Sequence, residues 1–91
     1  MTTDILLPDK LDTDAAAPLF DVLAEALGTD ATLDGRGCRG IGTLCAQVLL
    51  LFVRASEGHG TTIRLLPSDG LADDLRLLGL DGLLPDQGEH A

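Results

Sequence analysis

The chain has 91 residues, 45% of them hydrophobic and 23% charged, a composition typical of one globular domain and not of a disordered segment. Its formal net charge is −9, which argues against nucleic acid and anionic membrane surfaces as partners, because binding to either favours clustered Lys and Arg. The aromatic residues are Phe20 and Phe52, so we expect an aliphatic core.

No segment of the sequence predicts a membrane span or a signal peptide. The longest apolar run, 48–53, is far shorter than the ~20 residues that a membrane-spanning helix needs. The N-terminus lacks the basic start and long apolar stretch of a signal peptide. We therefore expect a cytoplasmic protein that does not insert directly into a membrane, with Cys38 and Cys45 as reduced thiols.

The first half of the chain predicts a strand, a helix and a second strand. A short apolar run at 5–7 indicates the first strand. Apolar residues at helical spacing over 16–27 predict the helix, whose N-cap is expected among residues 12–14. Pro18 is expected in its first turn, where proline is tolerated. The loosely alternating segment 29–34 predicts the second strand.

The second half continues this alternation. The glycine-rich segment Gly35–Gly42 is expected to be a flexible loop with glycines at positive φ. The apolar segment 43–57 is too long for a typical strand and predicts a helix. The β-branched and apolar run 61–66 predicts a third strand, and Pro67-Ser68-Asp69 is expected to cap a further helix that Gly79 and Gly82 break.

This order of elements predicts an α/β domain. We expect a single domain over 1–91, with its core at 5–84 and a polar tail at 86–91. The expected architecture is a mostly parallel four-stranded sheet with three to four helices. Leu83 and Leu84 are expected to pack back on the core.

The glycines of Gly35–Gly42 include the spacing G-x-G-x-x-G, which is that of the dinucleotide-binding fingerprint. Backbone N–H groups before a helix attract phosphate, and Arg36 and Arg39 add positive charge. A chain of 91 residues cannot, however, hold both mononucleotide-binding halves of that fold. We favour a structural loop and keep anion or nucleotide binding by this segment as an alternative function.

No set of residues predicts a metal site or a catalytic centre. Cys38, Cys45, His59 and His90 are not spaced as a close zinc-binding pair, so we expect no metal. Nucleophilic catalysis needs a base beside the nucleophile, and the histidines fall in a turn and in the tail. We therefore expect no enzyme activity and no cofactor.

The order and spacing of four segments resemble STAS domains, the fold shared by sulfate transporters and anti-sigma-factor antagonists. These segments are Leu11-Asp12, Thr32-Leu33-Asp34, Ile41-Gly42-Thr43-Leu44, and Pro67-Ser68 followed by Leu75-x-Leu77-Leu78-Gly79-Leu80. The resemblance covers 6–84 and implies a single STAS-like domain.

Thr43 stands where antagonists of this family carry the residue that a partner kinase phosphorylates. Gly42 replaces the family's Asp before it, and Leu44-Cys45 replace the small residue and glycine after it. The resemblance implies that Thr43 is a regulatory hydroxyl at a partner surface. The alternative is that Thr43 only caps the helix that begins there.

The segment 42–50 looks most similar to small STAS proteins of bacterial chemotaxis operons. The resemblance implies a non-enzymatic signalling protein whose partner is a histidine kinase, an anti-sigma-factor-like kinase or a response regulator. An alternative is the small STAS subunit that docks on the ATPase of a phospholipid-type ABC transporter.

Helical spacing divides 43–57 into two faces. The face expected to contact the sheet consists of Leu44, Cys45, Val48, Leu51, Phe52 and Ala55. The opposite face mixes apolar with polar residues, so it is expected to meet a protein partner or a second copy of the chain. The residues expected to bind this partner are Thr43, Ala46, Gln47, Leu50, Val53 and Arg54.

Overall fold

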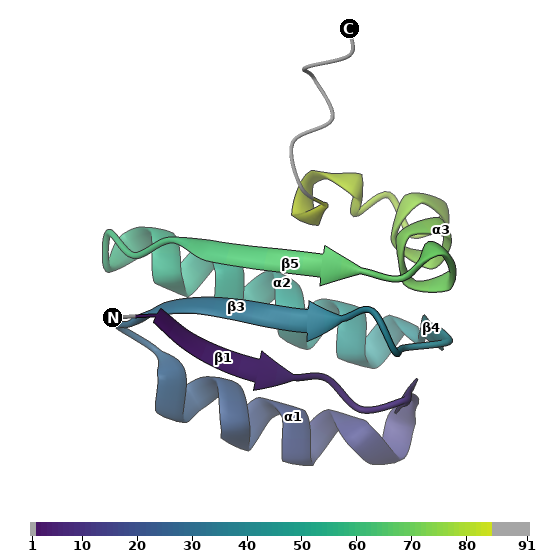
Figure 1. Cartoon of the computed structure of the whole chain (residues 1–91), viewed down its shortest axis with the longest axis horizontal. Coiled ribbons are helices and arrows are strands. Elements are labelled where there is room, and N and C mark those ends of the chain that lie inside the picture. Colours follow the sequence, from purple (N-terminus) through teal and green to yellow (C-terminus); the bar gives the residue numbers. More distant parts are fainter. Residues whose placement is uncertain (1, 85–91) are drawn as a thin grey trace, which may run out of the picture.

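Three parallel strands form the main sheet of residues 2–84, the part of the chain that the computed structural model describes (Figure 1). They are β1 (Thr2–Leu6), β3 (Asp30–Gly35) and β5 (Ile63–Pro67), in the order β1-β3-β5. In β3 the side chains of Ala31 and Leu33 point to the buried face, and Thr32 between them points to the other face. The three strands predicted from the sequence are confirmed.

Two helices, α1 (Thr13–Ala26) and α2 (Thr43–Gly58), pack against each other on one face of this sheet. Each connects one strand to the next in the same direction across the sheet, so right-handed crossovers put both on the same side. Figure 1 shows α2 behind the strands and α1 along the margin next to β1. The helix α3 (Asp69–Leu77) and the short 3-10 helix η1 (Asp81–Leu83) follow β5, which confirms the α/β class.

The expected four-stranded sheet is not found in the described residues. Instead, β2 (Lys10–Leu11) and β4 (Gly40–Ile41) pair in parallel as a separate two-stranded sheet. Strands of two residues are too short to leave an alternating pattern in the sequence. For this reason the sequence predicts only a loop where β4 lies.

Of the three N-cap candidates at 12–14, Asp12 is the one that caps α1, because its Oδ1 accepts a hydrogen bond from the Ala15 N–H at 3.2 Å. Gly28 follows the helix at a φ of 88°, a conformation that favours glycine. Pro18 lies inside the helix, so its expected place in the first turn is wrong. The helix tolerates this proline because Asp14 is exposed, and water can hydrate the carbonyl that lacks its helical N–H donor.

The described core is aliphatic except for Phe52, close to what the composition predicts. Its fully buried side chains include Leu33 from β3, Leu49 from α2 and Leu75 from α3. Leu84 after η1 is buried as well, so the C-terminal segment packs back on the core as expected. The polar tail expected at 86–91 lies outside the described residues. Among the helices of residues 2–84, none is long and apolar enough to cross a membrane.

The buried face of α2 differs from the predicted one. The residues that α2 buries are Cys45, Ala46, Leu49, Phe52 and Ser56. Leu44, Leu51 and Ala55, which were expected to contact the sheet, are exposed instead. Ala46, which was expected to bind a partner, is 1% exposed and belongs to the core, so it is not a partner-binding residue. The error amounts to a rotation of about 100°, or one residue of a helix.

The hydrophobic pattern of α2 could not predict this rotation. Because α2 is apolar on nearly every side, its hydrophobic pattern contains little information about which side faces the sheet. Cys45 and Ala46 are small and fully buried, and the Cys45 thiol contacts the Asp12 carbonyl at the start of α1. Ser56, a polar residue, lies on the same face and is fully buried.

Ser56→Ala should stabilise the protein by about 1 kcal/mol. The Ser56 hydroxyl has no hydrogen-bond partner among the described residues, and alanine removes that unsatisfied oxygen while favouring the helix. Chemical denaturation followed by circular dichroism measures the change in the free energy of unfolding.

Ser68→Ala is the control for this substitution. The Ser68 hydroxyl donates to the Cys38 carbonyl and accepts from the Leu71 N–H, so its removal should lower stability. A loss of stability in Ser56→Ala of similar size would show that the Ser56 hydroxyl has a partner after all.

Candidate partner-binding surface

The connections that follow β1, β3 and β5 meet at the carboxyl edge of the sheet, and α2 begins at this edge. Gly42 is the N-cap of α2, and Thr43 is its first residue and is exposed. Thr43 therefore does not cap the helix, and no side chain of the described residues does so. Its hydroxyl lies at the positive end of a 16-residue helix, where negative charge is stabilised.

The glycine segment before α2 is held in place by α3. The Asp74 Oδ2 on α3 accepts a hydrogen bond from the Ile41 N–H of β4 at 2.9 Å. A Cβ atom at Gly40 would collide with this carboxylate, and one at Gly70 would collide with the Arg39 carbonyl. Glycine is therefore needed here for close packing, and none of the glycines in Gly35–Gly42 has a positive φ. The expectation of a loose loop with glycines at positive φ is wrong.

Most of the backbone N–H groups that could hold a phosphate in this segment already have partners within the chain. Those with partners are Arg36 (Asp34 Oδ1, 3.1 Å), Cys38 (Gly35 O, 3.0 Å), Arg39 (Asp9 O, 3.0 Å), Ile41 (Asp74 Oδ2, 2.9 Å) and Gly42 (Leu11 O, 2.8 Å). Phosphate-binding loops instead present free N–H groups to the ligand. This geometry supports a structural role for the segment Gly35–Gly42.

The arginines at this edge are neutralised by neighbouring carboxylates. Arg36 makes a two-point ion pair with Asp34, with N–O distances of 3.0 Å, and this pairing lowers the pKa of the Asp34 carboxyl. Arg39 lies 3.3 Å from Asp9. Neither arginine is therefore free of a carboxylate partner, which weakens the case for an anion site here.

Both cysteines are free and buried, and both contact the connection between β1 and α1. The Cys38 thiol donates to the Pro8 carbonyl at 3.0 Å, and the Cys45 thiol donates to the Asp12 carbonyl at 3.2 Å. Burial raises the pKa of each thiol. Each thiol therefore keeps the proton that it donates in these hydrogen bonds. They are structural thiols.

Residues 2–84 contain no group of three or more His, Cys, Asp or Glu side chains that could hold a metal ion. Cys38, Cys45 and His59 do not form such a group. His90, the fourth residue considered from the sequence, lies outside the described residues.

The outer side of α2 is only partly open. Thr43, Gln47 and Arg54 are exposed, as a partner surface requires. Leu50 and Val53 are half-buried, and they border a groove of about 280 Å³ whose other wall is formed by residues of 79–83. The segment after α3 therefore covers part of the surface that the sequence assigns to a partner.

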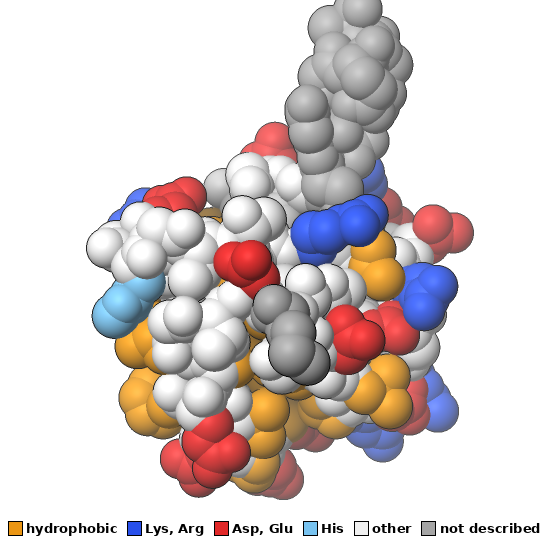
Figure 2. All heavy atoms as spheres, turned by 60° about the vertical axis from the view of Figure 1, so that its left-hand side comes forward, with side chains coloured by type: hydrophobic (Ala, Val, Ile, Leu, Met, Phe, Trp, Pro, Cys, Tyr) orange, Lys and Arg blue, Asp and Glu red, His pale blue; other side chains and the backbone are white. Residues whose placement is uncertain are grey.

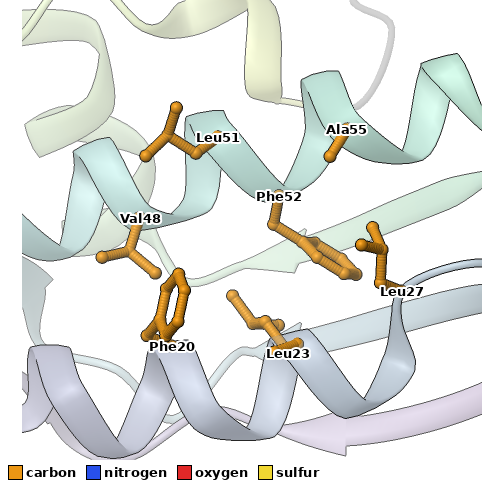
Figure 3. A pocket seen from close by; sticks show the side chains of 8 residues that line it. Phe20, Leu23, Leu27, Val48, Leu51, Phe52 and Ala55 are labelled. Atoms are coloured by element: carbon orange, nitrogen blue, oxygen red, sulfur yellow. The ribbon is translucent and has the colours of Figure 1, made fainter.

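A second surface, which the hydrophobic pattern did not predict, is an apolar groove of about 260 Å³ between α1 and α2 (Figure 3). We call it the α1–α2 groove. It is lined by Phe20, Leu23, Ala24 and Leu27 of α1 and by Val48, Leu51, Phe52 and Ala55 of α2. In Figure 3 Phe20 points toward Val48, and Phe52 points toward Leu27.

The sequence does contain a signal for this groove. The lining residues recur at intervals of three and four on each helix, which puts each set on one face. The groove was not predicted because its lining residues on α2 were assigned to the face of the helix that contacts the sheet. A comparison of both helices for exposed apolar faces would have found it.

Comparisons of the chain with models of known protein families, with curated proteins and with solved structures find no match.

Asp74→Ala should lower the free energy of unfolding by about 1–3 kcal/mol, because it leaves the Ile41 N–H without its acceptor. Asp73→Ala is the matched control on the same helix. Asp73 is exposed, and within residues 2–84 its ion pair is with the exposed Arg76, so its loss should change stability by less than about 1 kcal/mol. Urea denaturation of both variants gives the comparison. Equal losses would contradict the role assigned to Asp74.

Proposed function

We propose that this chain is a non-enzymatic, STAS-like regulatory domain that binds a protein partner in bacterial signalling. The observation that carries the proposal is the exposure of Thr43 in the first turn of α2, at the carboxyl edge of a parallel α/β sheet. This is the position at which the resemblance to anti-sigma-factor antagonists implies a regulated hydroxyl.

The surroundings of Thr43 suit a hydroxyl that a partner protein contacts. The segment before it is anchored to α3 by the hydrogen bond between Asp74 and Ile41, and Thr43 follows this anchored segment. A phosphate on Thr43 would be stabilised by the helix dipole. It would also add negative charge to a chain whose net charge is already −9. Phosphorylation would therefore change the charge that a partner meets without unfolding α2.

The partner in this proposal is a histidine kinase, an anti-sigma-factor-like kinase or a response regulator, and the complex forms in the cytoplasm. The exposed residues Gln47 and Arg54 extend the surface along α2 from Thr43. The acidic balance of the chain favours a partner whose contacting surface is basic.

The test is to capture partners from the native cell with the purified domain and to compare Thr43→Ala and Thr43→Asp with the wild type. We expect the wild type to capture one of these signalling proteins and Thr43→Asp to reduce capture about tenfold, a change of ~1.4 kcal/mol. Quantitative mass spectrometry measures the captured proteins.

Thr13→Asp is the matched control, because Thr13 is the exposed first residue of α1 and its substitution has a similar effect on a helix dipole. It should leave capture within about twofold of the wild type. If both Thr43 variants capture the same proteins as the wild type in equal amounts, Thr43 has no regulatory role. Capture of a transporter ATPase in place of a signalling protein would reject the signalling assignment.

A further inference from the structure

We propose that the α1–α2 groove is a docking site for a basic amphipathic helix of a partner protein. This site is separate from Thr43, and the inference goes beyond the proposed function without depending on it. It rests on the side chains that line the groove, on its dimensions and on the charge of α1.

Large apolar side chains of the α1–α2 groove are exposed to solvent. Phe20 is 55% exposed and Leu51 is 62% exposed. Both lie at the groove, beside the half-buried Val48. Figure 2 shows hydrophobic side chains gathered at the lower left of its view, with acidic side chains along the lower margin. Contiguous exposed apolar surface of this kind is typical of an interaction site.

The aromatic residues strengthen this argument. The chain has only two, Phe20 and Phe52, and both line the α1–α2 groove from opposite helices. Aromatic side chains are enriched among the residues that dominate binding energy at interfaces. The rest of the described core is built without them.

The dimensions of the groove favour a helix over a small molecule. Its volume of about 260 Å³ is below the range of roughly 300–1,000 Å³ that is typical of small-molecule sites. The apolar residues of α2 that face it, together with Leu44, recur at helical intervals from Leu44 to Ala55. Eleven residues at 1.5 Å each make this face about 16 Å long, which is three turns of helix. A partner helix laid along it would insert its apolar side chains between α1 and α2.

The charge of α1 selects a basic partner. The charged residues of α1 are Asp14, Asp21 and Glu25, and the helix contains no Lys or Arg. Their spacing puts them in one stripe, and all three are exposed. Of the three, Asp21 lies within one turn of Phe20 and Ala24 at the groove, whereas Glu25 lines a pocket with β1. Lysines flanking the apolar side of a docked helix could extend toward Asp21 while their stems cover the groove's rim.

The same charges disfavour a second copy of this chain as the occupant. Each copy has a net charge of −9, and a symmetric pair in which α1 faces α1 would also bring two acidic helices together, so like charges oppose association. A partner of opposite charge meets no such barrier.

The test measures binding of three synthetic peptides of about 18 residues, which is five turns of helix. The first combines Leu and Lys with the leucines on one helical face, the second has Glu in place of every Lys, and the third has the first composition in scrambled order. We expect the wild-type chain to bind the first peptide with a Kd of ~10 μM or tighter in fluorescence anisotropy and the other two at least about tenfold more weakly.

Leu51→Gln should weaken binding of the first peptide about tenfold. The control is Leu77→Gln on α3, because Leu77 is 83% exposed and lies outside the groove; it should bind the peptide as the wild type does. Circular dichroism confirms that both variants are folded. Thr43→Ala should leave peptide binding unchanged, which separates this site from the proposed function.

Three results would overturn the inference. Equal binding of the scrambled peptide would mean that charge alone drives association. Equal effects of Leu51→Gln and Leu77→Gln would place the peptide elsewhere. A wild-type dimer in sedimentation velocity that Leu51→Gln converts to a monomer would show that the groove is occupied by a second copy of the chain.

Discussion

The packing of one face of α2 into the core is the interaction on which the rest of this structure depends. Cys45 and Ala46 contribute small side chains to this buried face, and Leu49 and Phe52 continue it. The direction in which this buried face points determines which segments pack against the other sides of α2. One flank faces α1 across the α1–α2 groove, and the other faces the segment after α3. A helix that is apolar on nearly every side needs such cover, and the cover on the α1 side is incomplete.

The carboxyl edge of the sheet has a different character from the groove. There the contacts are polar and specific: Asp74 bonds to Ile41, and the buried thiols bond to carbonyls before and at the start of α1. Glycines permit these close approaches, and most N–H groups of the segment Gly35–Gly42 have partners within the chain. These contacts anchor the start of α2, and Thr43 is exposed at this start. The molecule thus has a polar edge and a separate apolar groove, two surfaces suited to contacts of different chemistry.

The sequence predicted the elements better than it predicted their faces. Strands and helices were found because β-branched runs, helical spacing and caps such as Asp12 and Ser68 are local signals. The phase of α2 was missed because its apolar residues surround the helix, and because Ser56 is buried despite its hydroxyl. The structural role of the segment Gly35–Gly42 was missed because the residues that pack against it, Asp74 and Gly70 of α3, lie about 30 residues further along the chain. Of the candidate site, the exposure of Thr43, Gln47 and Arg54 followed from the sequence, whereas the α1–α2 groove required knowing where both helices pack.

The orientation of α2 is the central claim of this account, and native-state thiol labelling tests it most directly. The two native thiols are buried, so the folded wild type should react slowly with a thiol reagent such as DTNB. Leu51→Cys should add one thiol that reacts at the rate of an unstructured peptide, because residue 51 is exposed. Ser56→Cys, a nearly isosteric change at a fully buried position, should add a thiol as protected as the native ones. Protection at 51 together with rapid labelling at 56 would contradict the orientation of α2, and with it the groove.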